Sequence, residues 1–111
     1  MKNYTLRELC ETCGVTRRAV QGYEDHGLIS PCGKTERCYL LYDSSAVEKA
    51  IKIKSLQNYG FTVKEIKLYL SSDNFTKKSM LKQKLEKLKR NKAQMISYIK
   101  EIEILINQKE I

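Results

Sequence analysis

The sequence predicts a mainly α fold, in which a compact N-terminal head of short helices and one hairpin precedes a single long helix. Three observations lead to this prediction. Thr-x-x-Glu capping boxes begin at Thr5 and Thr62, glycines and the single proline divide residues 1–75 into short segments, and residues 76–111 contain neither Gly nor Pro. A chain of 111 residues suits one small domain plus an extended element.

The first two predicted helices form a helix-turn-helix over residues 5–27. Thr5 and Glu8 can each accept a hydrogen bond from the other's backbone amide at the start of the first helix. Gly14 supplies the turn, because a residue without Cβ adopts left-handed backbone conformations at little cost, and Thr16 can cap the second helix. Apolar residues of the first helix recur at helical spacing and should face the core: Leu6, Leu9, Cys10 and Cys13.

The second helix carries basic and amide side chains on its outer face. Guanidinium and amide groups can bind the phosphates or the base edges of a nucleic acid. We expect Arg18 and Gln21 to contact base edges in the major groove. Phosphate contacts are expected from Thr16, Arg17 and Tyr23.

A hairpin, or wing, is predicted over residues 31–42. Pro31 and Gly33 mark a turn, and a run of β-prone residues follows it. Lys34 and Arg37 of the wing are then placed for phosphate contact, although a solvated loop is the alternative interpretation. Tyr39 is expected to be a further DNA-binding residue of the wing.

A second helix pair is predicted over residues 44–71 and completes a winged helix-turn-helix domain of residues 1–75. Asp43 or Ser44 can cap the first of these helices, and Gly60 ends it. The side chains expected to face inward are Val47, Ile51, Leu56 and Tyr59 in the first helix, and Ile66, Leu68, Tyr69 and Leu70 in the second.

Residues 76–111 are predicted to form one long dimerisation helix. Apolar side chains recur there at alternating spacings of four and three residues, which is the pattern of a coiled-coil seam with one polar interruption. A helix of about 33 residues is roughly 50 Å long, and the head is too small to cover that length if the helix folds back against it. We therefore expect a homodimer whose seam consists of Leu81, Leu85, Leu88, Lys92, Met95, Ile99, Ile102 and Ile106.

The distribution of charge along this helix favours an antiparallel coiled coil. Residues 77–92 carry eight Lys or Arg and one Glu, net +7, whereas residues 93–111 have a net charge of −1. A parallel pair would place two strongly positive halves side by side. An antiparallel pair instead places each positive half beside a weakly negative one, so it avoids that repulsion.

Four cysteines and five aromatic residues are candidates for ligand sites. Cys10, Cys13, Cys32 and Cys38 approach the spacing of a zinc site, but two of them lie on a helix face that should be buried. We favour separate reduced thiols and expect no metal and no cofactor. The aromatic residues could line a drug pocket, but aromatics at helical spacing usually belong to the core, which is the interpretation we favour: Tyr59, Phe61, Tyr69, Phe75 and Tyr98.

Composition narrows the class of protein further. The net charge of +8 and a pI near 9.4 favour a polyanionic partner, without distinguishing DNA from RNA. No apolar run approaches the roughly 20 residues that span a bilayer, and no signal-peptide pattern opens the chain, so we expect a cytoplasmic protein without a membrane partner. The single histidine, His26, belongs to no catalytic pattern, and we expect no enzyme.

The order of these elements resembles the MerR family of transcription regulators along residues 4–106. So does the run Tyr-Thr-Leu-x-x-Leu-x-x-x-x-Gly-Val-Thr that begins at Tyr4, followed by Tyr23-Glu24 and Gly27-Leu28. The resemblance implies a winged-helix dimer, joined by an antiparallel coiled coil, that bends and untwists promoter DNA. It implies double-stranded promoter DNA and a second copy of the chain as partners, with RNA polymerase as a further candidate. Because the sequence stops at Ile111 and no cysteine follows Cys38, we expect a short form that has neither a metal-sensing loop nor a C-terminal effector domain.

The sequence also departs from the family's pattern. The usual Arg-Tyr-Tyr-Glu is replaced by residues 21–24, Gln-Gly-Tyr-Glu, and the usual Asn-Gly-Tyr-Arg-x-Tyr of the wing by residues 37–42, Arg-Cys-Tyr-Leu-Leu-Tyr. One phosphate-binding arginine is thereby lost, and Arg37 is placed to replace part of its role. The alternative function is an excisionase-like or architectural DNA-binding protein of a mobile element, although such a protein has no need of a long dimerisation helix.

Overall fold

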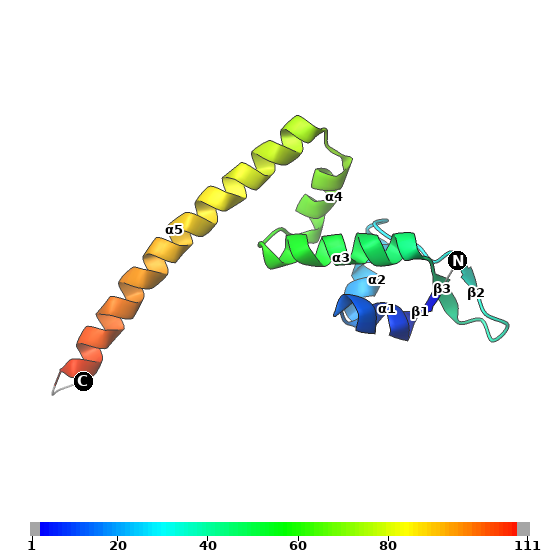
Figure 1. The fold of residues 1–111 in the computed structure, drawn as a ribbon, viewed down its shortest axis with the longest axis horizontal. Coiled ribbons are helices and arrows are strands. Elements are labelled where there is room, and N and C mark those ends of the chain that lie inside the picture. The colour runs from blue at the N-terminus through cyan, green and yellow to red at the C-terminus, as the bar shows by residue number, and fades with distance from the viewer. Residues whose placement is uncertain (1–2, 109–111) are drawn as a thin grey trace. The chain divides into compact units, whose positions relative to one another are not determined.

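The computed structural model describes residues 3–108 and confirms the mainly α fold (Figure 1). The chain divides between Ser72 and Asp73 into two units. The first unit contains β1 (Tyr4–Thr5), α1 (Leu6–Cys13), α2 (Arg17–Asp25), β2 (Gly33–Lys34), β3 (Leu40–Tyr42), α3 (Ser44–Asn58) and α4 (Val63–Ser71). The second unit contains α5 (Asn74–Asn107).

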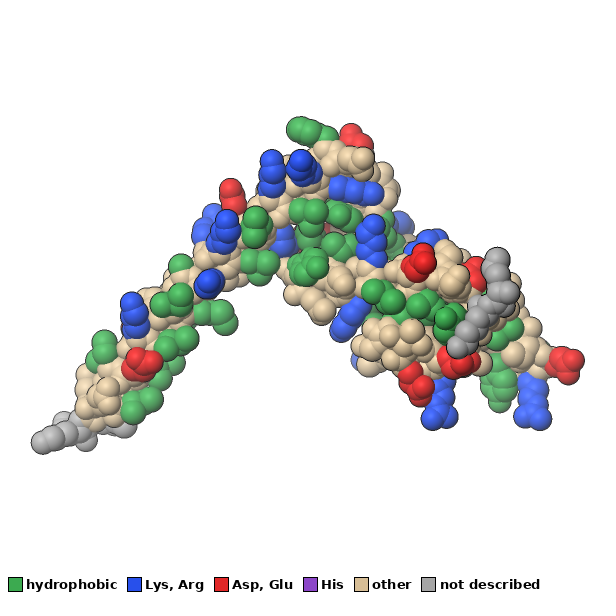
Figure 2. Space-filling model, in the orientation of Figure 1, with side chains coloured by type: hydrophobic (Ala, Val, Ile, Leu, Met, Phe, Trp, Pro, Cys, Tyr) green, Lys and Arg blue, Asp and Glu red, His purple; other side chains and the backbone are tan. Residues whose placement is uncertain are grey.

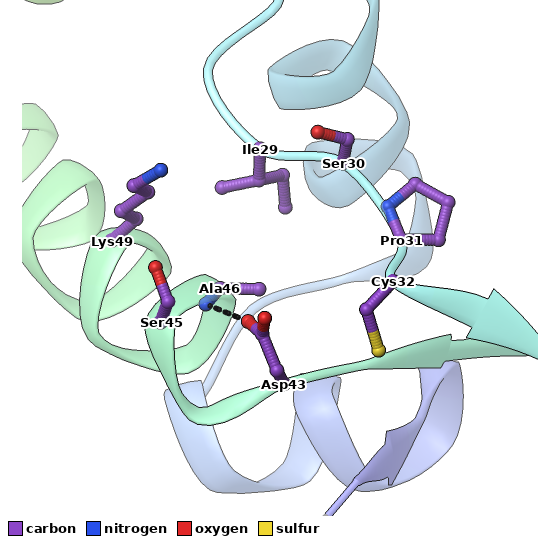
Figure 3. Close-up of a pocket in the computed structure, with 8 residues that line it drawn as sticks. All are labelled: Ile29, Ser30, Pro31, Cys32, Asp43, Ser45, Ala46 and Lys49. Carbon is purple, nitrogen blue, oxygen red and sulfur yellow. Dashed lines mark hydrogen bonds between the residues drawn. The ribbon is translucent and has the colours of Figure 1, made fainter.

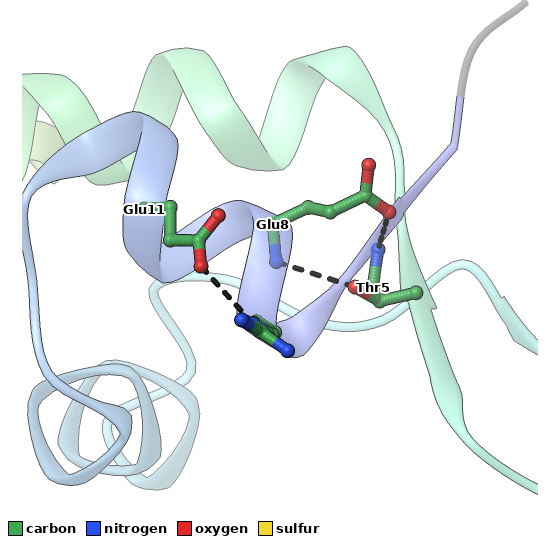
Figure 4. A network of polar contacts seen from close by, with 4 residues as sticks. Thr5, Glu8 and Glu11 are labelled. Carbon is green, nitrogen blue, oxygen red and sulfur yellow. Dashed lines mark hydrogen bonds and ion pairs between the residues drawn. The ribbon is translucent and has the colours of Figure 1, made fainter.

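Local capping signals determine where the helices of the first unit begin. Both halves of the capping box at Thr5 and Glu8 are formed, with N···O distances of 3.1 and 3.2 Å (Figure 4). The second box, at Thr62 and Glu65, is also complete. Gly14 ends α1 with φ of 66°, in the left-handed region that favours glycine. These predictions are therefore confirmed.

A small antiparallel sheet with the strand order β1-β3-β2 forms the wing and its root. The predicted hairpin is present, since Gly33 pairs with Leu41 across β2 and β3. The sequence did not predict β1, whose Tyr4 pairs with Tyr42. A strand of two residues has no periodicity of its own, and only its partner strand makes it recognisable.

The core of the first unit lies where α3 packs against α1, β3 and α4. Helix α3 turns one continuous face inward, on which two alanines allow neighbouring elements to approach closely. Every buried apolar side chain among the described residues belongs to this unit: Leu9, Val20, Tyr23, Ile29, Tyr42, Ala46, Val47, Ala50, Ile53, Leu56, Phe61, Ile66 and Tyr69.

Three side chains that the sequence placed in the core are instead exposed. Ile51 is 46% exposed, and Tyr59 and Leu68 are similarly open to solvent. The buried face of α3 runs through Ala50 and Ile53, and a residue one position after Ala50 lies about 100° around the helix. The prediction at Ile51 was wrong because it followed the large apolar residues and ignored the alanines that mark the inner face of α3.

Helix α5 has 34 residues and buries none of its side chains within the chain. It begins two residues earlier than predicted, because the Asp73 carboxylate accepts a hydrogen bond from the Thr76 amide at 2.7 Å. Figure 2 shows apolar side chains along this helix, with basic side chains gathered toward its N-terminal half. No helix in the part of the chain that the structure describes is long and apolar enough to cross a membrane.

Candidate nucleic-acid interface

The outer face of α2 presents the basic and amide side chains that the sequence singled out. Thr16 caps the helix by accepting a hydrogen bond from the Ala19 amide at 3.0 Å. Arg17, Arg18 and Gln21 are exposed beyond this cap. The Gln21 amide donates to Asp25 Oδ1 at 3.0 Å, which holds that side chain along the helix and leaves its carbonyl oxygen available as an acceptor. The face is therefore accessible and partly preorganised.

Tyr23 lies on the opposite face of α2, and the phosphate contact expected of it is wrong. Its side chain is 1% exposed, and its hydroxyl donates a hydrogen bond to Gln57 Oε1 at 2.6 Å. Burial raises the pKa of this hydroxyl. The signal was present in the sequence, because Val20 and Tyr23 share one helix face, three residues apart. Tyr23 anchors α2 to α3.

A second tyrosine anchors α2 to the root of the wing. The Tyr42 hydroxyl, on β3, donates a hydrogen bond to the Glu24 carboxylate. Tyr42 is fully buried, and its burial, followed by the hydrogen bond and the negative charge of Glu24, raises the pKa of the hydroxyl well above 10.0. Sequence reasoning missed this pair, since the two residues are 18 positions apart. Helix α2 is thus fixed to both α3 and the wing.

The raised pKa of these buried hydroxyls predicts that the protein loses stability at alkaline pH. Below pH 10, both the folded and the unfolded chain keep the Tyr42 proton. As pH rises further, the unfolded chain loses this proton while the folded chain retains it, so the free energy of unfolding should fall. Urea unfolding between pH 8 and pH 12 measures this fall. Tyr42→Phe should lose less stability than the wild type over that range, whereas Tyr98→Phe, on exposed α5, should lose as much. Equal losses in all three proteins would contradict the prediction.

The wing exposes the three side chains predicted for it. Lys34 lies on β2, and Arg37 and Tyr39 lie in the turn that joins β2 to β3. Hydrogen bonds hold this turn, including Thr35 N to Tyr39 O at 2.8 Å and Cys38 N to Thr35 O at 2.9 Å. Cys38 has φ of 64°, which is rare for a residue with a Cβ and places it where the family pattern has glycine. The tip is therefore an ordered turn.

A cleft of about 440 Å³ connects the start of α2 with the wing. It brings together Arg17 and Tyr39 from the predicted set. It also adds Arg7, which sequence reasoning did not single out because a lone exposed arginine on a helix carries no distinguishing pattern. Lys34, Arg37, Arg18 and Gln21 lie outside the lining of this cleft. The remaining lining side chains are Thr5, Leu6, Cys38 and Leu40.

A smaller cavity of about 200 Å³ lies between the wing root and the start of α3 (Figure 3). Lys49 and Ser45 reach it from α3, and Cys32 reaches it from the segment before β2. Its carboxylate belongs to Asp43, which accepts a hydrogen bond from the Ala46 amide at 3.0 Å and caps α3. This acid places negative charge where an anion would bind, so we assign no ligand to the cavity.

The four cysteines do not converge in the described part of the chain. Cys10 and Cys13 are partly buried, and burial raises the pKa of both thiols. The Cys13 thiol donates to the backbone carbonyl of Val47 at 3.6 Å. Cys32 and Cys38 are exposed on the wing, and no group of three or more potential metal ligands is found among the described residues.

The five aromatic residues considered as pocket lining separate into different environments. Phe61 and Tyr69 pack in the core of the first unit, with ring centroids 6.1 Å apart. Tyr59 is about half exposed on the same unit, and Phe75 and Tyr98 are exposed on α5. The core interpretation is therefore confirmed for Phe61 and Tyr69, and it is wrong within one chain for Tyr59, Phe75 and Tyr98, whose side chains are exposed.

Comparison with known proteins identifies relatives of the head and of the long helix. A model of the MerR HTH family regulatory protein matches residues 4–73. The HTH-type transcriptional activator mta of Bacillus subtilis is 30% identical over 100 residues, which cover 90% of this chain and 39% of that protein. The mercuric resistance operon regulatory protein of Bacillus cereus is 36% identical over 63 residues, covering 57% of this chain and 48% of that protein. The chain thus spans less than half the length of these relatives.

Solved structures share the fold over most of the chain. The crystal structure of MtaN, the N-terminus of the Bacillus subtilis multidrug transporter activator, has a TM-score of 0.72 and 28% identity, covering 95% of this chain and 99% of that one. HiNmlR, a MerR family regulator, has a similar fold, with a TM-score of 0.71 and 19% identity over 89% of this chain and 80% of that one. These named relatives are regulators and not enzymes. From the family match and these likenesses, the chain belongs to the MerR family of helix-turn-helix regulatory proteins.

Proposed function

We propose that this protein is a sequence-specific transcriptional regulator, which binds operator DNA as a homodimer and distorts the promoter. The observation that carries the proposal is the exposed face of α2, where Arg17, Arg18 and Gln21 project from a helix anchored by two buried tyrosines. A rigidly held helix of this kind fits the major groove of B-DNA. HiNmlR was solved bound to promoter DNA, which supports DNA as the polyanion.

The side chains of the head divide into two roles. Arg18 and Gln21 can form paired hydrogen bonds with purine edges, so we assign base recognition to them. Thr16 and Arg17 lie at the start of α2, where contact with the DNA backbone is expected. The wing side chains Lys34, Arg37 and Tyr39 supply further phosphate contacts. Residues 1–75 have a net charge of only +2, so these few contacts must carry much of the affinity of the head.

The seam of α5 supports a homodimer. Its apolar side chains range from 39% exposed at Leu81 to 66% exposed at Ile106. No residue of α5 is buried within a single chain, so these side chains are open to a partner. The seam is symmetric about a point between Lys92 and Met95, as an antiparallel pair requires. In that register, Lys92 packs against the partner's Met95, and the remaining layers pair Leu88 with the partner's Ile99, Leu85 with the partner's Ile102, and Leu81 with the partner's Ile106.

Charge supports the same register. Alongside the seam, the antiparallel pairing places Lys82 next to the partner's Glu103, and the two-fold axis repeats this contact. A parallel pairing would instead place Lys92 beside the partner's Lys92 within the seam. In an antiparallel pair of helices about 50 Å long, the N-terminal ends of the two helices, to which the heads are joined, lie at opposite ends of the coiled coil. We propose that the operator bends and untwists to meet both heads, a cost that depends on its sequence.

Separating base recognition from backbone contact tests this function. Arg18→Ala should weaken operator binding by about 1–3 kcal/mol and relax the base preference at one position of each half-site. Arg37→Ala should weaken all sequences alike and reduce the slope of log affinity against log salt by about one per lost contact in each half-site. Selection from a random duplex pool, followed by fluorescence anisotropy at several salt concentrations, measures both effects.

The matched control for Arg18→Ala is Arg90→Ala, which removes the same exposed charge from α5. We expect that variant to keep the base preference of the wild type. If Arg18→Ala weakens operator and random DNA equally while Arg37→Ala alters base preference, the roles of helix and wing are reversed. If the wild-type dimer selects no sequence at all, the proposed function is wrong.

A further inference from the structure

We propose that the cleft between α1, α2 and the wing is a binding site for one DNA phosphodiester, and that Arg7 contributes one of its ligands. In the free protein, Arg7 is bound by Glu11, and the phosphodiester displaces that carboxylate. The inference rests on the proposed function and adds to it a residue and an ion-pair exchange on the DNA-binding surface.

Three elements supply complementary groups to this cleft of about 440 Å³. Arg7 lies on the first turn of α1, Arg17 begins α2, and Tyr39 lies in the turn that joins β2 to β3. Two guanidinium groups and one phenol are donors, and no carboxylate is among the lining residues. Guanidinium groups bind phosphate oxygens bidentately, which matches this set of donors to a phosphodiester.

The apolar part of the lining suits the rest of a nucleotide. Leu6, from α1, and Leu40, from β3, both line the cleft. The ring of Tyr39, 64% exposed, offers a further apolar surface. Deoxyribose presents carbon atoms next to each phosphate, so these side chains can contact the sugar while the arginines bind the phosphate oxygens.

In the free protein, an ion pair with Glu11 competes with phosphate binding by Arg7. The Arg7 Nε donates to Glu11 Oε1 at 3.1 Å, four residues along α1 (Figure 4). Both side chains are largely exposed, so the ion pair is weak and exchanges readily. A phosphodiester held by Arg17 and Tyr39 would offer Arg7 two oxygens in a fixed position and would release a condensed counterion. The exchange therefore favours the complex.

A double-mutant cycle on the 111-residue chain tests this exchange. Arg7→Gln should weaken operator binding on the order of tenfold. It should also reduce the salt slope by about two for the dimer, one phosphate contact per half-site, without changing base preference. Glu11→Gln should tighten binding by about two- to fivefold, because it frees Arg7 from a weak surface ion pair. Anisotropy with the selected operator duplex measures all four members of the cycle.

The cycle separates an effect through Arg7 from a general effect of charge. If Glu11 acts by holding Arg7, Glu11→Gln should have no effect in the Arg7→Gln background. An equal gain in both backgrounds would overturn the proposed exchange. The charge-matched controls are Arg90→Gln and Glu86→Gln on α5, and both should leave the salt slope nearly unchanged. Melting temperatures close to that of the wild type show that each variant is folded.

Failure of this inference is distinguishable from failure of the proposed function. If the wild type binds its selected operator and the Arg7→Gln variant has the same affinity and the same salt slope, the proposed phosphodiester-binding site alone is wrong. A wild-type protein that shows no preference for any duplex would overturn the function on which the inference rests.

Discussion

Replacing Leu88 with Asp should convert the protein to a monomer and reduce operator affinity by at least about a hundredfold. In the proposed antiparallel register Leu88 would pack against the partner's Ile99, and the two-fold axis would repeat the layer. An ionised carboxylate in that seam loses its hydration without gaining a partner, at a cost of several kcal/mol per group. A single head then binds each half-site without the gain in effective concentration that the second head provides.

Light scattering measures the mass of the variant, and anisotropy measures its affinity for the operator. The matched control is Ile104→Asp, which introduces the same charge on the same helix but lies off the seam. Ile104 is 61% exposed and Leu88 is 44% exposed, so exposure within one chain does not distinguish them. We expect Ile104→Asp to remain a dimer. A dimeric Leu88→Asp variant, or a monomeric Ile104→Asp variant, would show that the seam is assigned to the wrong face.

Local signals in the sequence predicted the elements of this fold well. The capping boxes at Thr5 and Thr62, the left-handed turn at Gly14 and the cap at Thr16 are all present in the structure. Each depends on residues within four positions of one another, so a short stretch of sequence contains both partners of the interaction. The same holds for the long helix, because its uninterrupted pattern predicted its first residue to within two positions.

Features that depend on distant partners were not predictable in this way. The hydrogen bond between Tyr42 and Glu24 joins residues 18 positions apart, and β1 exists only because β3 pairs with it. The cleft that contains Arg7 and Tyr39 requires the wing to fold over the start of α1. Helix periodicity states which residues share a face, but the packing partner decides which face is buried. That limit explains the error at Ile51.

Alanine substitutions at Ile53 and Ile51 test which face of α3 is buried. Both residues lie on α3, two positions apart, but Ile53 is fully buried whereas Ile51 is 46% exposed. Ile53→Ala removes three carbon atoms from a closely packed core and leaves a cavity among its neighbours. The expected cost is about 2–5 kcal/mol in the free energy of unfolding. Ile51→Ala should cost less than about 1 kcal/mol, since solvent replaces the lost contacts and alanine is the better helix former.

Urea unfolding of both variants gives the two values, at one fixed protein concentration because the proposed dimerisation would add to stability. The comparison isolates burial, since the side chain, the helix and the substitution are the same at both positions. Ile53→Ala should therefore lower the transition midpoint much further than Ile51→Ala, with operator binding preserved in the Ile51 variant. Equal destabilisation would mean that Ile51 is buried in the assembled protein, against a second copy of the chain. A larger effect at Ile51 than at Ile53 would contradict the orientation of α3 and, with it, the packing that anchors Tyr23 to Gln57 beneath the proposed DNA-binding face.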